Sequence, residues 1–300
     1  MPKIGLGCAG LGTQYGNAHK RMSKEAAFNI LDTALVSNIQ FYDTAPDYGM
    51  SEEILGEWQI SRKASVEIVT KIPKTHICEE KTYKAFVKEQ IEKSMYRLKR
   101  RKFTLIQFHQ SDIGFLSSHY FHRTVDWLLD ERYTTAIGVS VYSPDEALCA
   151  LEVPQVSAIQ CPVNILDRRF VEPKMLALFR ERKIRLIARS IFLQGVLIET
   201  AKLPICKREK ELRELKRLCR VAACCALQSL RKMSYSYVAG IDAIDVGIIG
   251  ANTVRELEET IRLSEIFLEV PAKKALEVFD LAREYANEKE LFDPRTWNAP

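Results

Sequence analysis

Three side chains that can exchange protons stand at the ends of apolar stretches of the chain. An acid, Asp43, an amine, Lys71, and an imidazole, His109, each close one of three successive apolar runs. A single aspartate after a strand is more often a helix cap or a turn former than a reactive group. Three such groups at successive run ends would nevertheless face one site if the fold brought those ends together. Other polar residues end later runs or lie near their ends: Ser140, Gln160, Arg189 and Ser190.

The apolar runs themselves predict a fold that would bring their ends together. They are near-continuously apolar rather than alternating, which is typical of parallel strands buried on both faces. Eight such runs occur: Ile4–Cys8, Gln40–Asp43, Val66–Lys71, Phe103–His109, Thr135–Ser140, Val156–Cys161, Ile184–Arg189 and Ala243–Gly250. Helical patterns fill most of the gaps: Lys24–Ser37, Ser51–Ile60, Thr82–Arg100, Phe121–Asp130, Ser143–Leu151, Glu172–Lys183, Lys207–Lys232 and Thr253–Leu263. This count predicts an α/β fold of the (β/α)8 TIM-barrel type, whose active sites lie at the carboxyl ends of the strands. An open, doubly wound sheet is the alternative.

The chain is expected to form one domain over residues 1–300. Its 300 residues would allow two domains of average size, but single α/β barrels also reach about 250 residues or more. No stretch rich in Gly, Pro or Ser divides the sequence, and no internal repeat is visible. A further amphipathic segment, Pro271–Asn287, predicts a helix that flanks the barrel. We expect the polar tail after it to be loosely held.

Composition and charge are those of an ordinary folded chain. Hydrophobic residues make up 47% and charged residues 28%, the average for soluble proteins, which excludes a disordered or collagen-like chain. The net charge is +5, and the densest basic cluster, residues 97–102, follows a helical pattern, so we expect neither nucleic acid nor a membrane as a partner.

The eight cysteines show no metal-ligand spacing, so no metal site is expected. No secretory signal or apolar run of about 18 residues is present, and we expect a reduced, cytoplasmic protein.

The reactive residues fall within motifs that resemble those of a known family. The segment Phe41–Gly49 reads FYDTAPDYG and resembles the D-T-A-x-x-Y-G signature of the aldo-keto reductases. The resemblance covers essentially the whole chain. Two later segments, Leu166–Phe170 and Ala188–Gly195, resemble a bacterial subgroup often found with surface-sugar biosynthesis. Further matches to the family are Glu53, Gly56, Val69–Lys71, Leu105–His109, Ile137–Ser140 and Ile159–Gln160.

The resemblance implies a catalytic tetrad of Asp43, Tyr48, Lys71 and His109. Charge builds on the oxygen of a carbonyl as it is reduced, so a proton donor has to stand over that atom. A phenol is a poor acid at neutral pH, but a nearby ammonium stabilises the phenolate, which makes Tyr48 the expected general acid and Lys71 the group that tunes it. Asp43 would keep Lys71 charged and oriented. His109 would donate a hydrogen bond to the carbonyl oxygen.

A nicotinamide dinucleotide is implied as well, because no side chain can supply a hydride. The family implies NADP, with NAD as the competitor. Ser140 and Gln160 would hold the carboxamide, although Val141 stands where the family usually has an asparagine. Arg189 stands where the family has a stacking aromatic, and its flat guanidinium could lie on the nicotinamide ring or form a salt bridge inside the mouth. The loop expected over the pyrophosphate contains Ser190, Gln194 and Gly195.

The segment expected to bind the adenosine end departs further from the family. Ile249–Thr260 resembles the family's last strand-to-helix motif, and Glu259 matches the glutamate that contacts adenine. Gly250 and Glu256 replace positions that often carry a lysine and an arginine in NADP-preferring members. A 2′-phosphate attracts cations, and Arg255 is the only one close in sequence. The expected contacts at this end are Gly250, Asn252, Arg255, Glu256 and Glu259.

These residues indicate two function classes, and a third is weaker. The first is an NAD(P)-dependent oxidoreductase that interconverts the carbonyl and alcohol forms of a small molecule, for which a sugar is one candidate. The second is a cofactor-binding regulatory or scaffold barrel without turnover, against which the intact tetrad argues. The third is a metal-dependent barrel enzyme such as an isomerase. It would need a cluster of His, Asp and Glu at the strand ends, where only His109 and Asp43 are available.

Overall fold

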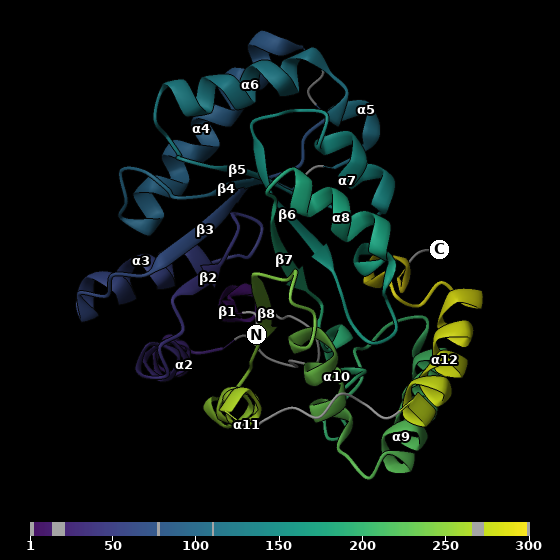
Figure 1. The fold of residues 1–300 in the computed structure, drawn as a ribbon. Helices are drawn as coiled ribbons and strands as arrows, with labels where there is room; N and C mark the ends of the chain where they lie inside the picture. Colours follow the sequence, from purple (N-terminus) through teal and green to yellow (C-terminus); the bar gives the residue numbers. More distant parts are fainter. Residues whose placement is uncertain (1–2, 14–21, 77–78, 110, 266–272, 299–300) are drawn as a thin grey trace.

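The computed structural model describes residues 3–13, 22–76, 79–109, 111–265 and 273–298. Its core is a closed barrel in which eight parallel strands follow one another in chain order. This confirms the predicted (β/α)8 fold and excludes the open doubly wound sheet (Figure 1). The strands are β1 (Lys3–Gly7), β2 (Phe41–Asp43), β3 (Glu67–Ile72), β4 (Ile106–Phe108), β5 (Ile137–Ser140), β6 (Val156–Pro162), β7 (Arg185–Arg189) and β8 (Val246–Gly250).

The barrel closes through parallel pairing of β1 with both β2 and β8. Its interior is filled by a cluster of buried apolar side chains that includes Phe41, Val69, Ala158 and Ile187. Side chains two positions apart in a strand point to the same face. The residues two positions after these four are therefore also on the inner face, nearer the carboxyl ends: Asp43, Lys71, Gln160 and Arg189.

The helices form the outer layer around the barrel (Figure 1). Serine side chains cap several of them, and Ser143 forms a complete capping box with Glu146 at the start of the helix after β5. Such caps satisfy backbone N–H groups that have no partner within the helix. The helices that precede β7 are α1 (Ala9–Gly12), α2 (Lys24–Val36), α3 (Ser51–Arg62), α4 (Glu80–Leu98), α5 (Ile113–Leu116), α6 (His119–Asp130), α7 (Pro144–Ala150) and α8 (Pro173–Glu181).

The helix predicted over Lys207–Lys232 is wrong as a single element, because the structure has two helices there. These are α9 (Glu209–Cys225) and α10 (Leu230–Ala239). Between them Leu227 adopts a left-handed backbone with φ of 53°, and Ser229 caps α10 by accepting from the Lys232 amide. The break turns the chain, so α10 is free to take a different direction from α9. The strand predicted to begin at Phe103 is likewise shorter, since its regular ladder covers only β4.

The C-terminal region is packed rather than loosely held. After α11 (Val254–Glu265), helix α12 (Lys273–Glu288) packs against α9, and Pro271 of the predicted flanking helix lies outside the described residues. The tail after α12 buries Trp297, which is 2% exposed and donates its indole N–H to the Leu291 carbonyl at 3.0 Å. The expectation of a loose polar tail is therefore wrong. Burial of the indole and of Leu291 supplies the apolar contact that holds the segment.

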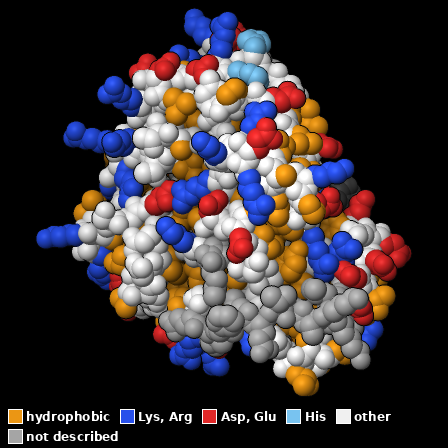
Figure 2. Space-filling view, in the orientation of Figure 1, with side chains coloured by type: hydrophobic (Ala, Val, Ile, Leu, Met, Phe, Trp, Pro, Cys, Tyr) orange, Lys and Arg blue, Asp and Glu red, His pale blue; other side chains and the backbone are white. Residues whose placement is uncertain are grey.

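No helix among the described residues is long and apolar enough to cross a membrane. On the face shown in Figure 2, lysine and arginine side chains are interspersed with carboxylates over the described part of the surface. The basic cluster at residues 97–102 lies at the end of α4, as predicted, where Lys99 adopts a left-handed conformation that ends the helix.

Candidate active site

The carboxyl ends of β2 and β3 bring an acid and an amine into direct contact inside the barrel. Lys71 Nζ lies 2.7 Å and 2.8 Å from the two carboxylate oxygens of Asp43 and donates to the Thr44 carbonyl at 2.9 Å. The Lys71 side chain is fully buried. Burial lowers the pKa of Lys71, and the Asp43 carboxylate opposes that effect. The ammonium also lies 5.0 Å from the centre of the Tyr48 ring, so three of the four predicted tetrad residues meet here.

His109 completes this group from the end of β4. Its ring meets that of Tyr48 edge-on, with 6.1 Å between the ring centres. Its Nδ1 lies 3.2 Å from a carboxylate oxygen of Asp47, a residue that the sequence motifs did not single out. Burial lowers the pKa of His109, whereas the contact with His109 lowers the pKa of Asp47. All four predicted residues therefore lie together at one end of the barrel.

The two residues predicted to hold the carboxamide are linked to the same acid. Ser140 donates to Gln160 Oε1 at 3.2 Å, and Gln160 Nε2 donates to Asp43 Oδ1 at 2.8 Å. All three side chains are buried. Asp43 thus accepts hydrogen bonds from an ammonium and an amide, which orients both neighbours as well as the acid.

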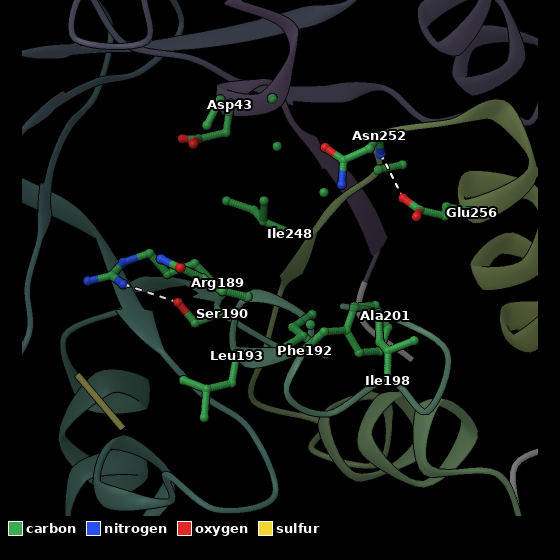
Figure 3. Close-up of a pocket in the computed structure, with 18 of the residues that line it drawn as sticks. Asp43, Arg189, Ser190, Phe192, Leu193, Ile198, Ala201, Ile248, Asn252 and Glu256 are labelled. Atoms are coloured by element: carbon green, nitrogen blue, oxygen red, sulfur yellow. Dashed lines mark hydrogen bonds between the residues drawn. The ribbon is translucent and has the colours of Figure 1, made fainter. Parts of the chain in front are cut away.

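A cavity of about 710 Å³ opens from this group and runs along the barrel mouth. Figure 3 shows Asp43 at one end, Arg189 and Ser190 on one side, and Asn252 with Glu256 on the other. Every residue predicted to bind the cofactor lines this cavity: Ser140, Gln160, Arg189, Ser190, Gln194, Gly195, Gly250, Asn252, Arg255, Glu256 and Glu259. Among the described residues no group of three or more His, Cys, Asp and Glu could hold a metal ion.

Two alternatives were expected for Arg189, stacking on the nicotinamide ring or a salt bridge inside the mouth, and its arrangement matches neither completely. Its guanidinium donates to the Val141 carbonyl at 3.0 Å and to Ser190 Oγ at 3.3 Å. The group stacks on the Tyr142 ring, 4.1 Å from the ring centre. Within the described part of the chain no carboxylate lies in ion-pair range of Arg189. The flat guanidinium is therefore positioned by stacking, by one carbonyl and by one hydroxyl rather than by a salt bridge.

The loop after β7 has an unusual backbone where the pyrophosphate contacts were expected. Ser190, Leu193 and Gln194 have φ angles of 60°, 43° and 49°, and Gly195 has a φ of 90°. Left-handed residues in succession cost free energy, and the turn is closed by its own backbone hydrogen bonds, from the Leu193 N–H to the Ser190 carbonyl and from the Gly195 N–H to the Phe192 carbonyl, both at 2.9 Å. The short turn η2 (Leu193–Gly195) forms part of this loop.

Two buried polar side chains fix this loop from outside. Asn164 donates to the Ser190 carbonyl at 3.2 Å, and Lys216 on α9 donates to the Gly195 carbonyl at 3.2 Å. Burial lowers the pKa of Lys216 to about 8. The sequence predicts neither contact, because a lysine in a charged helical run carries no signal that it will turn inward.

The far end of the cavity is a charged cluster on α10 and α11. The Glu256 carboxylate accepts a hydrogen bond from the backbone N–H of Asn252 at 2.8 Å. Glu259 is held by two arginines: Arg255 at 2.9 Å and Arg231, which reaches it from α10. The Arg231 side chain is only 10% exposed, whereas that of Arg255 is 87% exposed. Arg255 is thus one of several cations at this end, since Arg231 and Lys202 also line the cavity.

Comparison with known proteins identifies the family of this barrel. The family model described as "Aldo/keto reductase family" matches residues 3–277 of the sequence. The chain belongs to the aldo/keto reductase family. Similar curated proteins from Bacillus subtilis (strain 168) are the uncharacterized oxidoreductase YqkF, 29% identical over 209 residues, and the aldo-keto reductase YhdN, 28% identical over 203 residues. These matches cover 66% and 65% of this chain, and only 63% and 60% of the relatives' own length.

Solved structures of the family share the fold at low sequence identity. The holo form of aldo-keto reductase AKR11C1 from Bacillus halodurans is 21% identical, with a TM-score of 0.72 over 93% of this chain and 91% of the other. The glycerol dehydrogenase AKR11B4 from Gluconobacter oxydans is 20% identical, with a TM-score of 0.69 over 95% and 91% of the two chains. These structures show that the chain shares the barrel fold of other family members.

Proposed function

We propose that this aldo/keto reductase interconverts a carbonyl and an alcohol on a small molecule with a nicotinamide dinucleotide as its redox partner, and that the whole chain acts as one barrel domain. The observation that carries the proposal is the buried Lys71–Asp43 pair beside Tyr48 at one end of a long cavity. A general acid next to an enclosed ammonium is what carbonyl reduction requires, because charge develops on the substrate oxygen.

The four residues have separate tasks in this proposal. Tyr48 gives its proton to the substrate oxygen in reduction and takes it back in oxidation. Lys71 stabilises the phenolate through its charge, since an ammonium near a phenol lowers the phenol's pKa. Asp43 keeps that ammonium protonated against the desolvation that lowers the pKa of Lys71. His109 hydrogen-bonds the substrate oxygen and fixes its position over Tyr48.

The cavity fits a dinucleotide in its shape and its donors. A side chain built on Gly250 would meet no heavy atom within 4 Å, so this stretch of wall is open. Arg189 Nε is buried without a partner among the described residues, and Ser190, Gln194 and Gly195 of the loop after β7 line the cavity where the pyrophosphate would lie. A bound nicotinamide supplies the hydride equivalent that no side chain can. Ser140 and Gln160 would hold its carboxamide, and Arg189 would be the side chain available to its ring.

We propose NADP as the preferred cofactor, with NAD as the alternative. Arg231 and Arg255 flank Glu259 at the end of the cavity where the 2′-phosphate would lie, and guanidinium groups are well suited to phosphate.

For the substrate we propose a sugar or polyol. The support is the resemblance of Ala188–Gly195 to a sugar-associated subgroup and the polar groups at the mouth, Asp47, His109 and Tyr142.

The location and partners belong to the same proposal. The seven cysteines that the structure describes are all free thiols, which suits a reducing compartment such as the cytoplasm. Small molecules rather than nucleic acids or membranes are the proposed partners.

The decisive experiment compares Tyr48→Phe with Tyr133→Phe, a matched loss of one phenolic hydroxyl far from the cavity. We expect Tyr48→Phe to lower kcat for aldehyde reduction by about 10²–10⁴-fold, the usual contribution of general acid–base catalysis. Affinity for NADPH, measured by fluorescence titration, should stay within a few-fold because the dinucleotide contacts lie elsewhere. Near-normal kcat in Tyr48→Phe would reject the assignment. Tight cofactor binding without turnover of any carbonyl by the wild type would favour the regulatory or scaffold alternative.

A further inference from the structure

A carboxylate outside the proposed tetrad holds one nitrogen of His109. Asp47 Oδ2 lies 3.2 Å from His109 Nδ1. Asp47 belongs to the loop after β2 and His109 follows β4, so the contact joins two strand ends across the barrel mouth. The side chain of His109 is 17% exposed and that of Asp47 is 52% exposed. The imidazole is therefore mostly enclosed, and its partner is half open to solvent.

The chemistry of this pair decides which ring nitrogen carries the proton. The hydrogen bond with His109 lowers the pKa of Asp47, so Asp47 is ionised near neutral pH and its carboxylate can only accept hydrogen bonds. His109 Nδ1 must then be the N–H donor. In a neutral imidazole the other nitrogen, Nε2, consequently bears a lone pair and accepts hydrogen bonds. Only the imidazolium has an N–H on both nitrogens.

We propose that Asp47 is a positioning residue that holds His109 with its proton on Nδ1, so that Nε2 faces the substrate oxygen and donates to it only when the ring is an imidazolium. This inference rests on the proposed function, in which His109 meets that oxygen. A carbonyl oxygen needs a donor and is served by the imidazolium. In oxidation the single proton of the alcohol hydroxyl goes to Tyr48, the proposed base, so it is not available to the Nε2 lone pair of the neutral ring. The pair therefore makes carbonyl reduction depend on the imidazolium, and the rate of reduction falls as the pH rises.

The charges around His109 determine how removal of Asp47 acts. Burial and the Lys71 ammonium lower the pKa of His109, and the carboxylates of Asp47 and Asp43 raise it. The Tyr48 ring meets the imidazole edge-on, and the Lys74 ammonium lowers the pKa of Asp47. Asp47 exerts the largest of the raising influences. Neutralising it makes the pKa of His109 fall, so less imidazolium is present at any given pH.

The kinetic test compares Asp47→Asn with Asp145→Asn, which removes a carboxylate from the first turn of α7 at the same end of the barrel. The readout is kcat/KM against pH for aldehyde reduction and for alcohol oxidation. In Asp47→Asn the limb that depends on imidazolium should move to lower pH, and reduction at neutral pH should fall on the order of tenfold, less than the ~10²–10⁴-fold of a lost general acid. Asp145→Asn should keep the wild-type profile. An Asp47→Asn profile that overlays the wild type in both directions overturns the inference.

A second measurement reads the tautomer without any turnover. Two-bond ¹⁵N–¹H correlation spectra of the full chain distinguish Nδ1–H from Nε2–H imidazoles, and His109→Gln identifies the signal. We expect Nδ1–H in the wild type and a shift toward Nε2–H in Asp47→Ala. A wild-type His109 with its proton on Nε2 overturns the inference even if the enzyme is active. Failure of the wild type to turn over any carbonyl or alcohol would instead reject the proposed function, and the tautomer would still decide the role of Asp47.

Discussion

Replacement of Lys71 by methionine should destroy activity and also destabilise the fold, and the two effects can be separated. The Lys71 side chain is fully buried and that of Asp43 is 6% exposed. Methionine nearly matches lysine in length but removes the ammonium, so Asp43 is left as a buried carboxylate. Its remaining side-chain donor is the Gln160 amide at 2.8 Å. Breaking a buried ion pair by removing one partner costs about 3–5 kcal/mol, a large part of the ~5–15 kcal/mol that stabilises a typical protein.

The double variant Lys71→Met/Asp43→Asn removes both charges and so should recover most of that loss. Gln160 can still donate to the amide oxygen of the new asparagine, and no buried charge is left without a partner. Activity should not recover, because the ammonium proposed to tune Tyr48 is still missing. We therefore expect both variants to lose about 10²–10⁴-fold in kcat/KM for aldehyde reduction, while only the single variant unfolds at clearly lower urea.

Urea unfolding monitored by fluorescence gives the free energy of unfolding, and stopped assays with an excess of NADPH give the rate. Lys88→Met, which removes an exposed ammonium on α4, controls for the loss of one positive charge and should match the wild type in both measurements. A Lys71→Met variant with wild-type rates and pH profile would refute the tuning role. A double variant no more stable than the single variant would refute the electrostatic explanation of the instability.

Three further outcomes are expected. Arg231→Met should weaken NADPH binding by about 10–100-fold, the effect of losing one charge-assisted phosphate contact of roughly 1.5–3 kcal/mol. Arg255→Ala should weaken NADPH binding less, because Arg255 is exposed, and neither variant should change NADH binding; paired titrations with the two cofactors at one ionic strength check this. Trp297→Ala should lower the free energy of unfolding by about 3–5 kcal/mol in urea melts, and no change would show that the tail is not held by its indole. Gly56→Ala should destabilise by about 1–3 kcal/mol or more, because its Cβ would clash with the Arg97 carbonyl oxygen; a thermal melt unchanged from wild type would contradict that close approach.

The barrel could be predicted because its strands are buried on both faces. Continuous apolar runs are unusual outside parallel sheets, and eight of them alternating with helical patterns leave few other architectures. The same periodicity explains the position of the site. Asp43 lies two positions after Phe41 and Lys71 two positions after Val69, so each polar residue follows its apolar neighbour onto the inner face. Strand ends are therefore informative about function in this fold even when the loops are not.

The break between α9 and α10 could not be read from the same patterns. Residues 207–232 keep an amphipathic period throughout, and the interruption depends on Leu227, whose left-handed φ of 53° has no special residue type to announce it. The packed tail could not be predicted for a related reason. Its composition is polar, but one indole and Leu291 bury enough apolar surface to hold it, and a sequence window averages such single contacts away.

The end of the cavity proposed for the adenosine depends on that break. In a continuous helix each residue advances about 1.5 Å along one axis, so an unbroken α9 would have carried residues 226–232 onward along the axis of α9. Because Ser229 starts a new helix, Arg231 instead lies in the first turn of α10 and meets Glu259, 28 residues later in the chain, on α11. In the proposed cofactor site, the positive charge that the motif lacks at Gly250 and Glu256 would thus come from another helix, through Arg231 on α10. Cofactor preference in this chain is therefore to be judged from the three-dimensional arrangement of Arg231, Arg255 and Glu259, since the motif alone suggests a site poorer in cations than the one that the barrel assembles.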